Sequence, residues 1–305
     1  MQKLYIHQAI SISTQGFWEG FDLPELREAL EEFRAVDPDY KTVIPVMSLR
    51  RMSKITKMAL MCGLTISKNT ELVWDGIIVG TGLGNLADTE KFLTLISATD
   101  AGLNSPTAFT QSSHNTLSGQ IALQLKNHGY NLTHVQRGFS FENALQDAIL
   151  QANCGMKNIL LGSADEHIPL LDTLGREMKY EERAIVQFAE GASFFQLSAD
   201  VPSGIFVQDA LVKMKSENQL QEIDSFVTKN KVDKKCCLLI STSDMIVDIG
   251  MDRKSLGDLV GNYMTNSGIA MHLGCAYLQR EEYSHVLILN ANSEAGMGLT
   301  LLGHE

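Results

Sequence analysis

Apolar runs alternate with amphipathic segments along this chain. Apolar positions recur at helical spacing over residues 49–60, 110–123, 141–154 and 267–279. Continuous apolar runs of strand length occupy residues 74–79, 157–161, 235–240 and 285–289. Such runs are typical of strands that are buried on both faces, and strands of this kind need helices on both sides of the sheet. The pattern therefore predicts an α/β fold.

The two halves of the chain repeat one plan. In each half a buried helix precedes a continuous apolar strand, a turn containing glycine and an edge strand. The corresponding pairs are 74–79 with 235–240, 141–154 with 267–279, 157–161 with 285–289, and 193–197 with 297–302. The repeat predicts one domain over residues 1–305, with an N-terminal half at 1–200 and a C-terminal half at 201–305. Two layers of sheet are expected to enclose central helices rich in small residues.

A strand-to-helix elbow is predicted at residues 132–142 (LTHVQRGFSFE). Many α/β enzymes mount a nucleophile at such an elbow, because the helix N-terminus offers unpaired N–H groups and a partial positive charge. The tip of this elbow is Gln136-Arg137-Gly138, and no cysteine lies within it. Glu142, in the first turn of the helix, is expected to do no more than stabilise the helix dipole.

Two further patterns favour structural interpretations. The glycines of residues 80–84 have the spacing GxGxG, and no strand ending in an acidic residue follows about 20 residues later, so a close-packed turn is expected instead of a dinucleotide site. The five cysteines are scattered and lie mostly in apolar segments: Cys62, Cys154, Cys236, Cys237 and Cys275. We expect free thiols and no metal site, since no CxxC or HxxxH spacing occurs.

Composition narrows the classes of function. The 305 residues are 44% hydrophobic and 20% charged, which is typical of a soluble globular protein. The net charge of −11 argues against nucleic acid and anionic membranes as partners. No apolar run approaches the roughly 20 residues of a membrane span, and residues 1–6 lack the features of a signal peptide. A cytoplasmic protein is expected.

Several short motifs, which follow one another along the chain, carry a family resemblance. They are residues 50–53 (RRMS), 78–84 (IVGTGLG), 162–166 (GSADE), 188–192 (FAEGA) and the loop at 290–298. Together they resemble the thiolase-fold β-ketoacyl-ACP synthases, over nearly the whole chain. The chain is most similar to the compact ketosynthase-like subunits of aryl-polyene-type clusters. The resemblance implies a thiolase-like fold, with duplicated βα halves in a layered α-β-α-β-α arrangement.

Condensing members of that family use an elbow cysteine and two histidines. The thiolate carries the acyl chain, while the histidines assist decarboxylation of a malonyl thioester and stabilise the enolate or oxyanion. The resemblance places the nucleophile slot at Gln136 or Arg137 and the histidine slots at Ser243 and Ser267. An amide such as Gln136 does not attack a thioester. The chain thus resembles the chain-length-factor subunit of paired ketosynthases, in which Gln replaces Cys, and its status as an enzyme stays open.

The same resemblance supplies expectations about substrate and partners. Phe139, Phe141 and Met271 line a substrate tunnel or fill the core, and Glu294 stands where the family has a gating Phe. No cofactor is expected. The partners are an acyl carrier protein and a catalytically intact ketosynthase, or a second copy of this chain, with no nucleic acid and no membrane. The family's dimer surface includes the elbow strand.

Two alternatives remain open. The first is an active β-ketoacyl-ACP synthase or acyltransferase with relocated catalytic residues, using Ser140 or a cysteine outside the elbow. The second is a homodimeric acyl-binding scaffold. Around these sites, His134 and the turn Asp165-Glu166-His167 are expected to be mainly structural.

Overall fold

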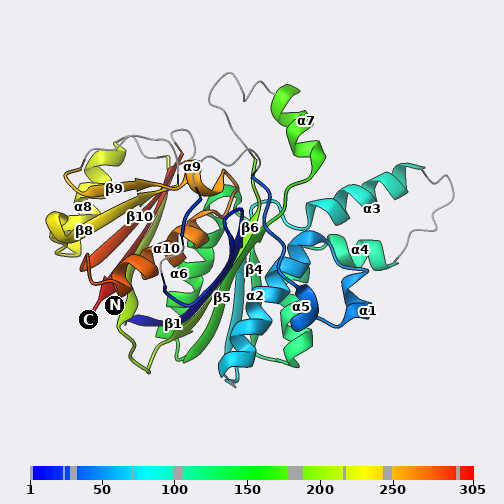
Figure 1. Cartoon of the computed structure of the whole chain (residues 1–305), viewed down its shortest axis with the longest axis horizontal. Coiled ribbons are helices and arrows are strands. Elements are labelled where there is room, and N and C mark those ends of the chain that lie inside the picture. Colours follow the sequence, from blue (N-terminus) through cyan, green and yellow to red (C-terminus); the bar gives the residue numbers. More distant parts are fainter. Residues whose placement is uncertain are drawn as a thin grey trace.

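The computed structural model describes residues 3–22, 25–27, 33–70, 72–98, 106–177, 188–215, 218–242, 249–292 and 296–305. In this part of the chain, 11 strands form one connected sheet (Figure 1). Its order is β4-β3-β5-β6-β1-β7-β11-β10-β8-β9, and β2 pairs with β1. The strands are β1 (Leu4–Ser13), β2 (Gly16–Glu19), β3 (Gly76–Gly80), β4 (Tyr130–His134), β5 (Asn158–Asp165), β6 (Gly191–Ser198), β7 (Ile205–Met214), β8 (Cys237–Ser241), β9 (Asp252–Ser255), β10 (His285–Asn292) and β11 (Gly296–His304).

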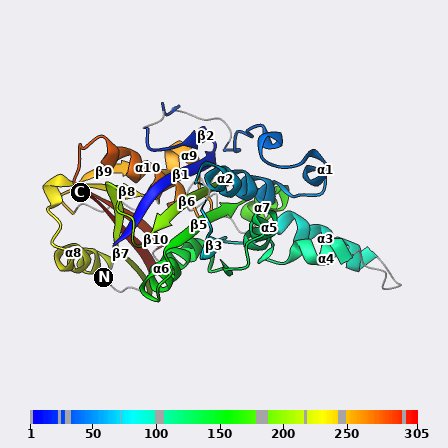
Figure 2. The same ribbon diagram turned by 90° about the horizontal axis from the view of Figure 1, so that it is seen from below.

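The helices pack on this frame in layers (Figures 1 and 2). They are α1 (Val46–Leu49), α2 (Lys54–Thr70), α3 (Leu86–Ala98), α4 (Pro106–Ser112), α5 (Thr116–Leu125), α6 (Ser140–Asn153), α7 (Pro169–Glu177), α8 (Gln219–Lys229), α9 (Gly257–Val260) and α10 (Ser267–Gln279). A short 3-10 helix, η2 (Arg137–Phe139), precedes α6.

Three apolar cores separate the layers. The central core joins α6 and α10 to strands of both halves, a second joins α2 and α5 to β1, β3, β5 and β6, and a third joins α8 to β8, β10 and β11. Successive residues of one strand enter different cores: Ile159 and Leu161 of β5 face α6, and Leu160 faces α2 and α5. This two-sided burial explains the continuous apolar strands. The predicted α/β fold with a layered α-β-α-β-α arrangement is confirmed.

The predicted duplication is visible in the strand pairing. In the N-terminal half, β3 is parallel to β5, and β5 is antiparallel to β6. In the C-terminal half, β8 is parallel to β10, and β10 is antiparallel to β11. β1 joins the halves, because it pairs with β6 along most of its length and with β7 at Leu4 and Tyr5. The boundary at residue 200 stays a prediction.

Two predicted helices are each broken in the structure. The segment 49–60 contains the end of α1, a turn and the start of α2 at Lys54, where the Ser53 and Thr56 hydroxyls are 3.0 Å apart and hydrogen bonded. The segment 110–123 is divided into α4 and α5 at residues 113–115. Polar residues that favour helix starts lie at both breaks. Within the described ranges, every helix is too short or too polar to span a bilayer.

Candidate functional site: the elbow between β4 and α6

The elbow forms as predicted, at the end of an edge strand. Among the described strands β4 pairs only with β3, and η2 and α6 follow it directly. Arg137 has the positive φ of +52°, which few residues other than glycine adopt. Gln136 and Arg137 at the tip are both exposed in the isolated chain. The elbow thus presents an amide and a guanidinium where the resemblance places a nucleophile slot.

The Ser140 hydroxyl holds the turn together. Its Oγ accepts a hydrogen bond from the Gln136 amide at 2.7 Å and donates one to the Arg137 carbonyl oxygen, also at 2.7 Å. The side chain is fully buried. Both roles of the hydroxyl are therefore used within the turn, and no histidine in the described ranges hydrogen-bonds to it.

The glycine cluster after β3 lets the elbow pack closely. A Cβ on Gly80 would lie 2.6 Å from the Ser140 carbonyl oxygen, and one on Gly82 would lie 2.0 Å from Cβ of Met264. Gly84 has a φ of +70°. The prediction of a close-packed turn is confirmed, because any side chain at Gly80 would collide with the start of α6.

The elbow lies against the ends of three C-terminal elements. Asn290, in β10, donates from Nδ2 to the Gly138 carbonyl oxygen (2.6 Å) and to Glu142 Oε1 (2.8 Å). Its Oδ1 accepts from the Thr242 hydroxyl at 3.2 Å, just after β8. Asn266, before α10, donates to the Thr242 carbonyl oxygen at 3.3 Å. The fold thereby brings the elbow, the residue preceding Ser243 and the residue preceding Ser267 into one place.

Glu142 is a buried acid at the centre of this arrangement. Burial raises the pKa of Glu142 to about 7, and the nearby Asn290 amide and Ser267 hydroxyl only partly offset the rise. Glu142 Oε2 and Ser267 Oγ are buried and lack a hydrogen bond of normal geometry in the described ranges. Gly298 makes room for the acid, since a Cβ there would lie 2.7 Å from Glu142 Cγ. Burial therefore favours the protonated form of this carboxyl group.

Asp165 connects the elbow side of the sheet to the start of α10. Its Oδ1 accepts from the Thr81 hydroxyl (3.0 Å) and the Gly82 amide (2.8 Å). Its Oδ2 accepts from the amide (2.9 Å) and hydroxyl (2.7 Å) of Thr265. Burial raises the pKa of Asp165, while these four donors favour its charged form. With every acceptor site engaged, Asp165 acts as a structural link, as the sequence predicts.

Histidines near the elbow are engaged elsewhere. His134, in β4, is 2.9 Å from Asp147 Oδ2, and Tyr130 donates to the same oxygen at 2.9 Å. His272, inside α10, is 2.7 Å from the Ser11 hydroxyl and 2.6 Å from the Gly20 carbonyl oxygen. Burial lowers the pKa of His272 to about 4, so this imidazole is neutral. Both histidines have structural partners.

The predicted tunnel residues lie mainly in the core. Phe141 and Met271 are fully buried in the central core, and the Phe141 ring is 5.9 Å from that of Phe195. Phe139, next to the elbow tip, is buried at 4% exposure. Ser243 and Glu294 lie outside the described residues. A role for Phe139, Phe141, Met271 and Glu294 around a substrate stays a prediction, and so does the histidine slot at Ser243.

Sequence reasoning overlooked Glu142 and Asn290 as a pair. In the sequence, Glu142 has only the features of an acid at a helix N-terminus. Its burial is caused by β10 and β11, which follow about 150 residues later. One available signal was the small residue Gly298 within an otherwise apolar strand, since such glycines often mark a close approach. The site therefore contains a buried acid, an amide and a hydroxyl. The elbow has no thiol, and its histidine, His134, is hydrogen-bonded to Asp147.

Comparisons with known proteins agree on the family and the fold. Residues 27–221, more than half of the chain, match the family described as "Beta-ketoacyl synthase, N-terminal domain". No curated protein sequence matches the chain.

Solved structures match along the whole chain at low identity. One is a type II polyketide synthase acyl-carrier protein in complex with its ketosynthase bound to the hexaketide, with 13% identity, a TM-score of 0.82 and coverage of 100% of this chain and 99% of that one. Another is the ishigamide ketosynthase/chain length factor, with 16% identity, a TM-score of 0.74 and 99% coverage of both chains. A ketosynthase in complex with its chain length factor from Xenorhabdus doucetiae has 14% identity, a TM-score of 0.62 and 100% coverage of both. These likenesses show the fold.

Proposed function

The chain belongs to the β-ketoacyl synthase family, and from that premise we propose that it is a non-condensing subunit of the chain-length-factor type. It pairs with a catalytically intact ketosynthase in fatty acid or polyketide biosynthesis. Its task is to shape the space that receives a chain carried on an acyl carrier protein. It forms no covalent intermediate of its own.

One observation carries this proposal: the elbow is intact in shape but lacks the groups for thioester chemistry. The tip has the exposed amide of Gln136 and the exposed guanidinium of Arg137. The hydroxyl of the turn belongs to Ser140, and it is hydrogen-bonded to the main chain of both residues. The slot at Ser267 faces the Glu142 carboxyl in place of a second histidine. A thioester-cleaving nucleophile of this kind needs a cysteine with a free base beside it, but the elbow has no cysteine, and its histidine, His134, is hydrogen-bonded to Asp147.

The exposed edge of the sheet supports pairing with another chain. In the part of the chain that the structure describes, β4 has a strand neighbour on one side only, and it leads directly into the elbow. A partner that adds a strand along β4 would bring its own elbow close to Gln136. Complexes of a ketosynthase with a chain length factor are among the solved structures that share this fold.

Co-expression with an intact ketosynthase tests the proposal. The pair, this chain alone and the ketosynthase alone are supplied with a malonyl thioester on acyl carrier protein, and products are measured by mass spectrometry. We expect products from the pair and none from this chain alone. Gln136→Ala, as a variant in the pair, should retain the condensation rate within a few-fold, because no covalent step uses this residue.

Two outcomes would contradict the proposal in different ways. An acyl adduct on this chain, seen as a mass increase and lost in Ser140→Ala, would support an active acyltransferase with a relocated nucleophile. A homodimer that binds acyl chains and ignores every ketosynthase would support the homodimeric scaffold instead.

A further inference from the structure

A pocket of about 390 Å³ lies on the opposite face of the sheet from the elbow helix. It is bordered by α1, α2, α3, α4 and α5, and no elbow residue lines it. Helices α2 and α5 belong to a different apolar core from α6 and α10. The volume is within the range of small-molecule sites. The proposed function does not involve this pocket.

The pocket has an open mouth and a buried floor. At the mouth, Met47 is 75% exposed and Arg51 is also exposed. At the floor, Thr56 is 4% exposed and Asp88 is 9% exposed. A ligand in this pocket would therefore have one end near a guanidinium and the other near a carboxyl group.

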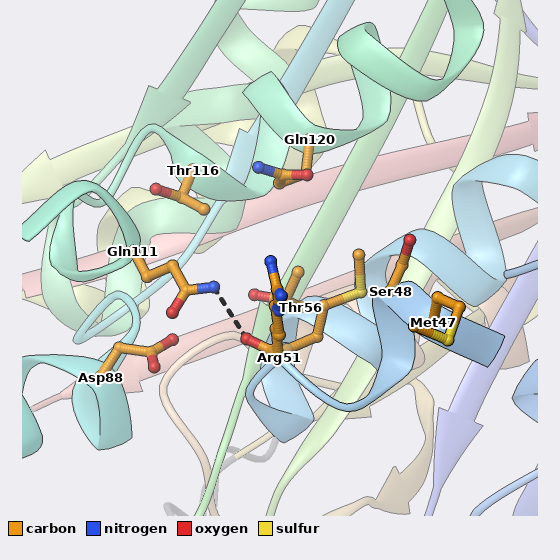
Figure 3. A pocket seen from close by; sticks show the side chains of 9 residues that line it. Met47, Ser48, Arg51, Thr56, Asp88, Gln111, Thr116 and Gln120 are labelled. Atoms are coloured by element: carbon orange, nitrogen blue, oxygen red, sulfur yellow. Dashed lines mark hydrogen bonds between the residues drawn. The ribbon is translucent and has the colours of Figure 1, made fainter. Parts of the chain in front are cut away.

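The main chain of Arg51 is held by a hydrogen bond, whereas its guanidinium has no partner among the described residues. The Gln111 side chain donates from Nε2 to the Arg51 carbonyl oxygen at 2.7 Å (Figure 3). Within the described ranges, the Arg51 guanidinium makes no hydrogen bond or ion pair. An arginine presented in this way suits a carboxylate or a phosphate, which accept its paired donors.

Asp88 gives the floor the opposite preference. Burial raises its pKa, against the Ser53 hydrogen bond and the positive charge of Lys91, which favour the ionised form. Glu166, a second buried acid, lies close enough for Asp88 to raise its pKa as well. Of these two acids only Asp88 lines the pocket, and its carboxyl disfavours an anion at the floor and favours a group that donates hydrogen bonds.

The wall between mouth and floor is polar on one side and apolar on the other. Figure 3 shows Gln111, Thr116 and Gln120, from α4 and α5, facing Arg51 across the pocket. The Gln111 Oε1 and the Gln120 amide have no hydrogen-bonding partner in the described ranges. On the α1 side the thioether of Met47 offers an adaptable apolar surface. This combination suits a ligand with an amide or hydroxyl group beside a short hydrocarbon portion.

We propose that this pocket binds a small organic anion that carries a carboxylate or phosphate at one end and an N–H or O–H donor at the other. The anionic group pairs with Arg51 at the mouth. The donor group points to Asp88 at the floor, and amides in between pair with Gln111 and Gln120.

Isothermal titration calorimetry on the full chain tests this assignment with probes of defined charge. The dipeptide alanyl-leucine carries a carboxylate and an ammonium group, alanyl-leucinamide lacks the carboxylate, and phosphoethanolamine replaces it with a phosphate. We expect at least one of the two anionic probes, alanyl-leucine or phosphoethanolamine, to bind. If alanyl-leucine binds, alanyl-leucinamide should bind roughly tenfold more weakly, because it lacks the carboxylate.

Two neighbouring arginines provide a matched pair of variants. Arg50 and Arg51 are both exposed, but only Arg51 lines the pocket. Arg51→Gln should weaken the anionic probe by roughly tenfold or more, whereas Arg50→Gln should leave its affinity unchanged. Circular dichroism confirms that both variants are folded.

Each result assigns or overturns the site. Binding of the phosphate probe alone, or of the carboxylate probe alone, would identify the anion. Binding that is equal in Arg51→Gln and the unmodified chain would overturn the proposal. The proposal would also be overturned if neither anionic probe bound at a concentration of about 10 mM, because a pocket built for such an anion should have a dissociation constant below that concentration.

Discussion

Glu142 shows how one side chain acquires its character from distant parts of the chain. In an isolated helix it would be an exposed acid in the first turn, favourable to the helix dipole. In the folded protein it is 1% exposed, against Gly298 of β11 and beside Asn290 of β10. The consequence is a pKa of about 7 for Glu142, caused mainly by burial.

This pKa predicts that part of the stability is lost as pH rises. The pKa of Glu142 in the folded state, about 7, is above the ordinary value of 4.5, so between these two pH values the folded protein binds a proton that the unfolded chain has released. The stabilisation is complete below about pH 4.5 and is lost as pH increases through 7. The measurement is the free energy of unfolding, obtained by urea denaturation at pH 5 and at pH 8. Between these pH values it should fall by roughly 2–3 kcal/mol more in the unmodified chain than in Glu142→Gln.

Glutamine is a suitable substitution because its uncharged amide keeps the acceptor for Asn290 and adds a donor toward Ser267. Glu166, whose pKa burial also raises to about 7, titrates in both proteins and cancels in the difference. The exposed Glu90 gives the control, since Glu90→Gln should leave the pH dependence unchanged. Equal pH profiles for the unmodified chain and Glu142→Gln would contradict the assignment.

At the scale of elements, the contact between β3 and α6 fixes the position of the elbow. The last residue of β3 is Gly80, and a Cβ there would lie 2.6 Å from the Ser140 carbonyl oxygen and 2.9 Å from Cα of Phe141. These are main-chain atoms of a helix start, which do not move aside as a flexible side chain would. The close approach therefore depends on glycine.

Gly80→Ala should consequently destabilise the protein and displace the elbow. We expect a loss of roughly 1–3 kcal/mol in the free energy of unfolding, as for other overpacked sites. Gly138→Ala is the matched control, because a Cβ at this elbow glycine meets no atom within 4 Å. Thermal denaturation of the two variants compares them directly. A Gly80→Ala protein as stable as Gly138→Ala would show that α6 is free to shift.

The elements themselves were predictable to different degrees, for physical reasons. β5 and β8 are continuous apolar runs because both of their faces lie in cores, and such runs stand out in a sequence. β7 does not stand out in this way, because Gln208 and Asp209 interrupt its apolar residues. Both side chains hydrogen-bond to Asn230, near the end of α8. Those partners are set by tertiary structure and leave no local pattern.

The helix breaks illustrate the same limit close to a functional feature. Residues 49–60 and 110–123 each have the apolar spacing of one helix, and each is divided in the structure. Both breaks border the pocket that contains Arg51 and Gln111. Local sequence predicted the elbow, because a strand and a helix adjoin there. The pocket arises from segments about 60 residues apart, which no local pattern connects.

At the scale of the whole molecule, the edge strand β4 has main-chain groups that no other described strand pairs with. The Tyr130 amide donates to the Asp75 carbonyl oxygen, and the His134 carbonyl oxygen accepts from the Thr81 amide. Alternation along β4 then directs the main-chain groups of Asn131 and Thr133 away from β3. The side chains of both residues contact Ser118 of α5, which holds the strand against the body of the protein.

Thr133→Pro should therefore weaken association through this edge without removing a bond to β3. Proline eliminates an outward N–H group and obstructs an approaching strand, while edge strands tolerate it. We expect the dissociation constant of the dimer, with a ketosynthase or with a second copy, to rise roughly tenfold or more in analytical ultracentrifugation. Thr133→Val separates the two roles of the residue, because it loses the Ser118 hydrogen bond but keeps the main-chain donor. If the proline variant stayed folded by circular dichroism and associated as tightly as Thr133→Val, the partner would have to dock away from β4, and the elbow would lie outside the shared interface.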